Sequence, residues 1–185
     1  SNFAGGLNGL MIDIAHPADS SQLDAGDFTF LFGNDNAPAG WSPVSPPTVE
    51  VRSGAGRGGS DRVVLTWDAA TAVHNAWLQV TVLAAPADSG LPAADVFYFG
   101  HSTGDVGDAA GPGMVTAADL VAIRNHPRGS ANPAAIDDRY DINRDRLVNA
   151  VDLILARNNI GSPLDALRMI APPAIPTPAP PMDGL

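Results

Sequence analysis

The sequence contains no cysteine and no lysine, and Glu50 is its single glutamate. Without cysteine, the chain has no disulfide to stabilise it and no thiolate for catalysis or metal binding. All other acidic residues are aspartates, and 20 acidic against 10 basic residues give a net charge of −10. This charge argues against a nucleic-acid partner, because nucleic-acid binding needs a basic surface. Short carboxylates suit hard cations, although a compositional bias also explains an excess of aspartate.

Long apolar runs are also absent. No stretch approaches the length of a membrane span, and the first residues lack the basic and apolar parts of a signal peptide. The sequence has no histidine-based zinc signature and no G-x-S-x-G nucleophile motif. We therefore expect a protein without a membrane span and without catalytic activity, which is a processed product or a fragment of a longer chain.

The first 100 residues combine short runs of β-branched and aromatic residues with turn residues. The pattern predicts strands at 10–14, 27–32, 48–52, 62–67, 76–83 and 96–99. About six or seven short strands without a long helix predict an antiparallel β-sandwich. The run from Gly54 to Gly59 matches the G-x-G-x-x-G pattern of dinucleotide-binding loops, but a strand and not a helix follows it. We interpret it as a hairpin.

Three tryptophans raise a carbohydrate-binding hypothesis, because exposed aromatic rings can stack on sugars. Trp67 and Trp77 lie in strongly patterned strands, which favours a place in the core for both. Trp41 lies beside Gly40 and Pro43 on a predicted loop. It is the one tryptophan to test as a sugar platform.

The stretch 141–152 has the spacing of a calcium loop. A chain wrapped once around Ca²⁺ aims alternate side chains inward, supplies a backbone carbonyl at position 7 and closes with a carboxylate at position 12. The predicted ligands are Asp141, Asn143, Asp145, the carbonyl of Leu147, Asn149 and Asp152. An apolar run begins at Leu153 and ends near Asn158 to Gly161, which predicts a short helix after the loop. The alternative is a polar loop that binds nothing.

The same unit occurs twice. A shift of 33 residues aligns 116–125 with 149–158, so the two segments are copies. The first loop, 105–119, is three residues longer than the 12-residue pattern. Its predicted ligands are Asp105, Asp108, the carbonyl of Met114, Thr116 and Asp119. A first loop that no longer binds metal is the alternative here.

These paired loop–helix units resemble the dockerin domain, a duplicated calcium-binding module that is related to the EF-hand and closes its loop with Asp. From Val96 onward, the chain also resembles the C-terminal dockerin-type modules of secreted planctomycete proteins. The resemblance implies two bound Ca²⁺ ions, an extracellular or cell-surface location and a protein partner. One position departs from the EF-hand pattern, because Arg146 stands where a glycine would form the sharp turn.

In dockerins of cellulose-degrading complexes, the partner cohesin reads small polar residues at loop positions 10 and 11. The matching positions of this chain carry apolar residues, namely Ala117, Ala118, Ala150 and Val151. This departure removes the hydroxyls that a cohesin would use. We expect these residues to pack against the β-sandwich, or to serve a partner of different specificity.

The expected fold is thus mainly β with a small α part, an antiparallel β-sandwich followed by a dockerin-like pair of calcium loop–helix units. We assign 1–100 to the sandwich, 101–171 to the calcium-binding part and 172–185 to a proline-rich tail of extended polyproline conformation. The short connection after residue 100 predicts that the two parts form one rigid body. The expected function is structural, adhesive or self-assembling. Alternatives are a carbohydrate-binding module of a secreted enzyme and a dockerin with a cohesin-like partner.

Overall fold

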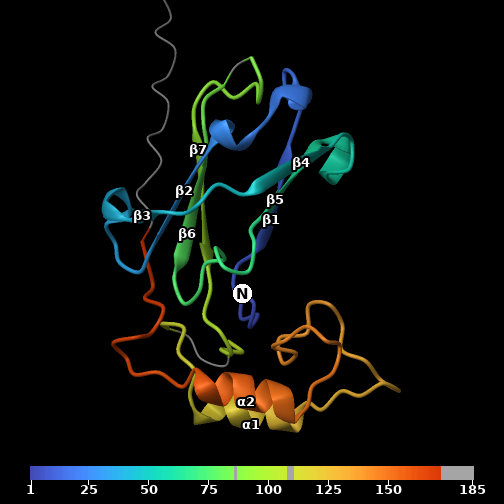
Figure 1. Ribbon diagram of the computed structural model, residues 1–185, viewed down its shortest axis with the longest axis vertical. Helices are drawn as coiled ribbons and strands as arrows, with labels where there is room; N and C mark the ends of the chain where they lie inside the picture. The colour runs from blue at the N-terminus through green and yellow to red at the C-terminus, as the bar shows by residue number, and fades with distance from the viewer. Residues whose placement is uncertain (86, 108–110, 172–185) are drawn as a thin grey trace, which may run out of the picture.

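A computed structural model describes residues 1–85, 87–107 and 111–171 (Figure 1). The strands form two antiparallel sheets, one with the order β1-β5-β4 and one with the order β3-β2-β6-β7. They are β1 (Gly9–Ile14), β2 (Phe28–Gly33), β3 (Ser42–Pro43), β4 (Thr48–Arg52), β5 (Asp61–Thr66), β6 (Trp77–Val82) and β7 (Asp95–Gly100). The helices of the described residues are α1 (Ala117–Asn125) and α2 (Ala150–Asn158). Short 3-10 turns are η1 (Ser20–Gln22), η2 (Ala25–Asp27), η3 (Pro38–Gly40) and η4 (Arg57–Gly59).

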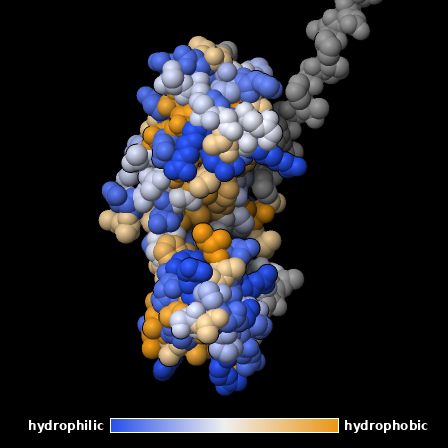
Figure 2. All heavy atoms as spheres, turned by 90° about the vertical axis from the view of Figure 1, so that its right-hand side faces the viewer, coloured by the Kyte–Doolittle hydropathy of each residue, from blue (hydrophilic) through white to orange (hydrophobic). Residues whose placement is uncertain are grey.

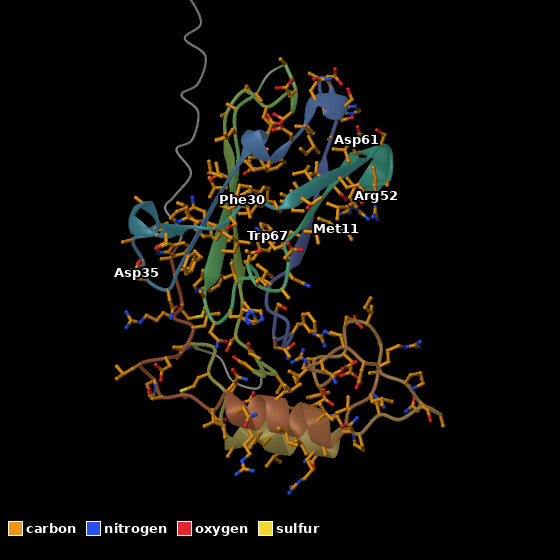
Figure 3. The ribbon with its side chains drawn as sticks, in the orientation of Figure 1. Met11, Phe30, Asp35, Arg52, Asp61 and Trp67 are labelled. Carbon is orange, nitrogen blue, oxygen red and sulfur yellow. The ribbon has the colours of Figure 1, made fainter. Side chains whose placement is uncertain are left out.

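The two sheets face each other across one hydrophobic core, which confirms the predicted sandwich. Val63 and Leu65 of β5 are fully buried, because alternate side chains of a strand point to the same face. In Figure 3, Phe30 of β2 and Trp67 after β5 lie between the sheets, and their rings meet edge to face with centroids 5.3 Å apart. Each of the six predicted strands is present to within one residue at both ends. Only the two-residue β3 was not predicted.

The glycine-rich run after β4 forms the predicted hairpin. β4 and β5 pair antiparallel, and η4 lies in the connection between them. Gly58 and Gly59 have φ angles of +67° and +85°, a conformation that glycine adopts without steric cost. The run therefore turns the chain between two strands.

The prediction that Trp41 is an exposed sugar platform was wrong. Trp41 is only 7% exposed. Its ring covers the face of Gly33, where an added Cβ atom would lie 2.3 Å from the indole. The indole N–H donates to Asp35 at 2.9 Å, and the ring meets Tyr98 edge to face. The missing side chain of Gly33 thus makes room for a tryptophan on the outer face of the sheet.

The two helices lie side by side at one end of the molecule (Figure 1). They enclose a second, smaller core, to which each loop contributes the residue after its first aspartate, Val106 and Ile142. Each loop also contributes a valine that forms a β-bridge to the segment after the other helix, Val115 with Ile160 and Val148 with Arg128. The duplicated units therefore support each other reciprocally. Neither helix has the length and apolar composition to cross a membrane, and no other helix occurs among the described residues.

Segments from both ends of the described chain run between the sandwich and the helices. The N-terminal segment lies between the two parts (Figure 1), where the N–H groups of Ser102 and Gly104 donate to the carbonyls of Ser1 and Asn2. At the other end, residues 163–165 form a turn, and Leu167 forms a β-bridge to Gly113. The proline-rich tail lies outside the described residues.

A buried histidine, His101, directly follows β7, where the chain leaves the sandwich for the two loop–helix units. The Nδ1 atom of His101 accepts the N–H of Asn75 at 3.1 Å, so the proton is on Nε2, which donates to the carbonyl of Phe3 at 2.9 Å. Burial lowers the pKa of His101 to about 4. A neutral imidazole therefore joins three segments of the chain.

Candidate metal centre

The second loop ends in a capping box at the start of α2. The side chain of Asn149 accepts the N–H of Val151 at 2.7 Å, and the carboxylate of Asp152 accepts the N–H of Asn149 at 2.9 Å. The other oxygen of Asp152 accepts the N–H of Ile142 at 2.8 Å. The carboxylate at position 12 thus ties the helix to the beginning of the loop.

Asp141, at position 1, differs from Asp152 because only one of its two carboxylate oxygens accepts a hydrogen bond from the described residues. Its side chain is 1% exposed, and one oxygen accepts the N–H of Arg146 at 2.8 Å. The other oxygen, Oδ1, is buried and has no hydrogen-bond partner among the described residues. Burial raises the pKa of Asp141, and the negative charges of Asp152 and Asp145 add to this effect. A buried, unpaired carboxylate oxygen is costly unless a proton or a cation compensates it.

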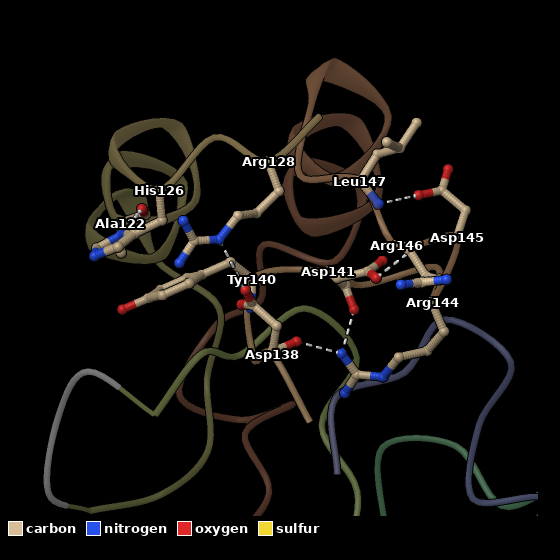
Figure 4. A network of polar contacts seen from close by, with 10 residues as sticks. All are labelled: Ala122, His126, Arg128, Asp138, Tyr140, Asp141, Arg144, Asp145, Arg146 and Leu147. Carbon is tan, nitrogen blue, oxygen red and sulfur yellow. Dashed lines mark hydrogen bonds and ion pairs between the residues drawn. The ribbon is translucent and has the colours of Figure 1, made fainter. Parts of the chain in front are cut away.

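The middle of the second loop curls through local hydrogen bonds. Asn143 accepts the N–H of Asp145 at 3.1 Å. Asp145 accepts the N–H of Leu147 at 2.8 Å (Figure 4). Arg144 and Arg146 between them have φ angles of +60° and +72°, the left-handed region that glycine normally occupies. Arg146 therefore adopts the turn that its position requires.

The predicted second site is present as one loop with oxygen-bearing side chains, but its carboxylates do not converge. No three acidic or histidine side chains of the described residues are grouped closely enough to hold a metal. Instead, the carboxylates of Asp145 and Asp152 accept N–H groups of their own loop. The predicted donor set contains only oxygen atoms, which fits Ca²⁺, and Oδ1 of Asp141 is a buried member of this set without a hydrogen-bond partner among the described residues.

The first loop repeats the closing contacts of the second. Asp119 accepts the N–H of Val106 at 2.9 Å and the N–H of Thr116 at 2.7 Å, and Thr116 caps α1. At the start of this loop, Asp105 accepts the N–H of Gly107 at 2.7 Å. The predicted ligand Asp108 lies outside the described residues. Met114, whose carbonyl was the predicted position-7 ligand, is half-buried.

Side chains that the sequence did not single out hold the second loop in place. In Figure 4, the Arg144 guanidinium donates to the carbonyls of Asp138 and Asp141. It also donates to the side chain of Asn2 at 3.0 Å. The carboxylate of Asp138 forms an ion pair with Arg128 at 3.4 Å and accepts the N–H of Tyr140 at 3.0 Å. No local pattern predicts the contact with Asn2, because 142 residues separate it from Arg144.

The prediction that the residues at loop positions 10 and 11 pack against the sandwich was wrong. All four side chains are exposed, and Val151 is 46% exposed. They stand on the first turns of α1 and α2, whose buried sides face the second core instead. Val121 and Ile154, one turn further along, are 45% and 54% exposed. Each helix therefore presents an apolar face to solvent.

Comparison of the chain with protein-family models, with curated proteins and with solved structures finds no match. The argument for a function therefore depends on the geometry of the two loops.

Proposed function

We propose that the chain is a non-catalytic, extracellular calcium-binding module in which Ca²⁺ stabilises a dockerin-like pair of loops packed on a β-sandwich. The observation that carries the proposal is the buried Oδ1 of Asp141 without a partner. It stands at position 1 of a loop whose positions 3, 5, 9 and 12 also carry side-chain oxygens. These residues, with the carbonyl of Leu147, would hold the ion.

Bound calcium would supply positive charge to a part of the protein that is crowded with aspartates. The residues of the chain hold the loop in the shape that the ion would bind. Arg146, through its left-handed backbone, turns its N–H toward Asp141, and Asp152 fixes the helix against the start of the loop. Because calcium would bind the folded loop, calcium should stabilise the fold by mass action.

Thermal unfolding in calcium and in EGTA tests the proposal. Calcium at about 100 times its Kd should stabilise the protein by about 2.7 kcal/mol, which raises Tm by roughly 5–10 °C. Asp141→Asn should remove most of this gain. In EGTA, the same variant should melt a few degrees higher than the wild type, because it removes a buried, unpaired charge.

Asp68→Asn is the matched control, because Asp68 is exposed and its side chain makes no hydrogen bond to the described residues. It should behave as the wild type in both conditions. Equal melting temperatures of the wild type in calcium and in EGTA would contradict calcium binding. A lower Tm of Asp141→Asn in EGTA would contradict the assignment of the unpaired charge.

Self-assembly is the second candidate function, and the exposed apolar faces of α1 and α2 favour it. The two faces come from the duplicated units, with Val121 matching Ile154 along the repeat. We expect light scattering in calcium to detect oligomers that Ile154→Lys dissociates. Met11→Lys is the control, since Met11 is 60% exposed on β1, away from the helices (Figure 3). A monomer at all concentrations would exclude self-assembly. Carbohydrate binding keeps no specific observation in its favour, because Trp41 is buried.

A further inference from the structure

The N-terminal segment, residues 1–4, is attached directly to the second loop. The N–H of Ala4 donates to the carbonyl of Ile142, at loop position 2, at 2.8 Å. The side chain of Asn2 donates to the carbonyl of Arg139 at 2.7 Å and accepts from Arg144 at 3.0 Å. Asn2 is only 7% exposed, and a buried amide that loses its partners is costly. The segment therefore depends on the loop for its own hydrogen bonds.

The loop depends equally on these contacts. Arg144 is at position 4, between two predicted ligands, and its guanidinium gathers the carbonyls of Asp138 and Asp141 together with Asn2. The planar fork of an arginine reaches several acceptors at fixed angles, which an ammonium group does not. The backbone of Arg144 is in the left-handed region, a conformation that surrounding contacts must maintain.

The segment also connects the loop to the sandwich. It continues into β1, and on its other side it accepts hydrogen bonds from Ser102 and Gly104, which precede the first loop. A cleft of about 910 Å³, lined by Phe3, Asp141, Arg144 and Arg146 among others, opens where this segment meets the second loop. Figure 2 shows apolar side chains gathered between the upper and the lower part of the molecule on the face that is turned to the viewer.

We propose that Asn2 and Arg144 are positioning residues of the second calcium site, so that calcium binding and docking of residues 1–4 strengthen each other. The inference rests on the proposed function of the loop. Neither residue is a ligand. They hold the backbone between Asp141 and Asp145 in the shape that places the ligands, and a calcium ion that fixes this backbone holds the segment in return. Thermodynamic linkage requires the two effects to be equal in size.

Arg144→Lys and Arg157→Lys form a matched pair for the test. Both keep the net charge of the chain. Arg157 is exposed in the last turn of α2, and its side chain makes no hydrogen bond to the described residues. Titration calorimetry with CaCl₂ should show about tenfold weaker binding at the second site for Arg144→Lys, as expected for one or two lost hydrogen bonds to a charged group. Arg157→Lys should stay within about twofold of the wild type.

Amide hydrogen exchange of Ala4 gives a readout that is independent of the affinity measurement. Exchange at this amide should slow by roughly the same tenfold factor when calcium is added to the wild type, and should respond much less in Arg144→Lys. Asn2→Ala removes the contact with Arg144 from the other side and replaces Arg144→Lys if that variant does not fold. The effects of Asn2→Ala and Arg144→Lys on binding should add up to more than the effect of the double variant, because both remove the contact between Asn2 and Arg144.

The outcomes separate the two proposals. Equal affinities of the two lysine variants, or exchange of Ala4 that calcium does not change, would overturn the coupling and leave calcium binding intact. Absence of calcium binding in the wild type would overturn both.

Discussion

The two loops close in the same way and are held in different ways. In both, the last aspartate accepts the N–H of loop position 2, Val106 at 2.9 Å and Ile142 at 2.8 Å. In both, it also accepts the N–H of the residue that caps the following helix. The closing end is therefore determined by a local motif that was copied with the repeat.

The opening ends differ because long-range contacts decide them. The carbonyl of Val106 accepts a hydrogen bond from the Arg139 guanidinium at 3.1 Å, whereas the carbonyl of Ile142 accepts the N–H of Ala4. Asp141 has a buried oxygen without a partner among the described residues. The second loop is thus both the loop of regular length and the one joined to the N-terminal segment. The comparison indicates that a duplicated unit keeps its local motif while its two copies acquire different neighbours.

The largest expected effect comes from removing the closing carboxylates. Asp119→Ala and Asp152→Ala each leave buried N–H groups unpaired, so in EGTA each should lower the free energy of unfolding by roughly 3 kcal/mol or more. In calcium, Asp152→Ala should cost more than Asp119→Ala, because it also removes a predicted ligand of the proposed second calcium site. Urea unfolding in both conditions measures the four values. A much smaller cost of Asp119→Ala in EGTA would show that the closing contacts are not equivalent.

A smaller effect concerns the pH dependence of the contact between His101, which precedes the first loop, and the carbonyl of Phe3. The pKa of His101 is about 4 in the folded protein and about 6.5 when unfolded, so the unfolded chain binds more protons between these values. The contribution of His101 to the free energy of unfolding should therefore fall by up to about 3 kcal/mol as the pH drops from 6.5 to 4. Below pH 4 this contribution should not change further. Protonation would also place a second donor opposite the N–H of Asn75.

His101→Gln isolates this contribution, because glutamine does not titrate. In EGTA, the difference in free energy of unfolding between the wild type and His101→Gln should shrink as the pH is lowered through this window. A difference that stays constant from pH 7 to 4 would contradict the role of His101. The hydrogen bond between Asn2 and Arg144 on the second loop does not involve His101, so His101→Gln should leave it in place.

The sequence predicted what local patterns determine. Alternating apolar residues located the strands, and the spacing of oxygen-bearing side chains located the loops and the helices that follow them. The contact between Asn2 and Arg144 could not be predicted, because its partners are 142 residues apart and each is an ordinary polar residue in its own context.

Two errors have the same physical origin. Trp41 is adjacent to turn residues and reads as a loop residue, yet the bare face of Gly33 receives its ring. The apolar residues at loop positions 10 and 11 were expected to pack against the sandwich. They lie instead in the first turns of helices whose other sides fill the second core. In both cases the burial of a side chain was decided by the partner across the fold and not by its neighbours in the sequence.

The smallest expected effect separates helix capping from metal binding. Thr116→Ala and Asn149→Ala each remove an N-cap acceptor, at 3.1 Å and 2.7 Å from its N–H donor, so each should cost about 1 kcal/mol in EGTA. Thr116→Ser and Asn149→Asp keep the acceptor and serve as controls. In calcium, the cost of Asn149→Ala should exceed that of Thr116→Ala, because Asn149 is also a predicted ligand of the proposed second calcium site. Equal costs in both conditions would mean that position 9 caps the helix and does nothing for the metal.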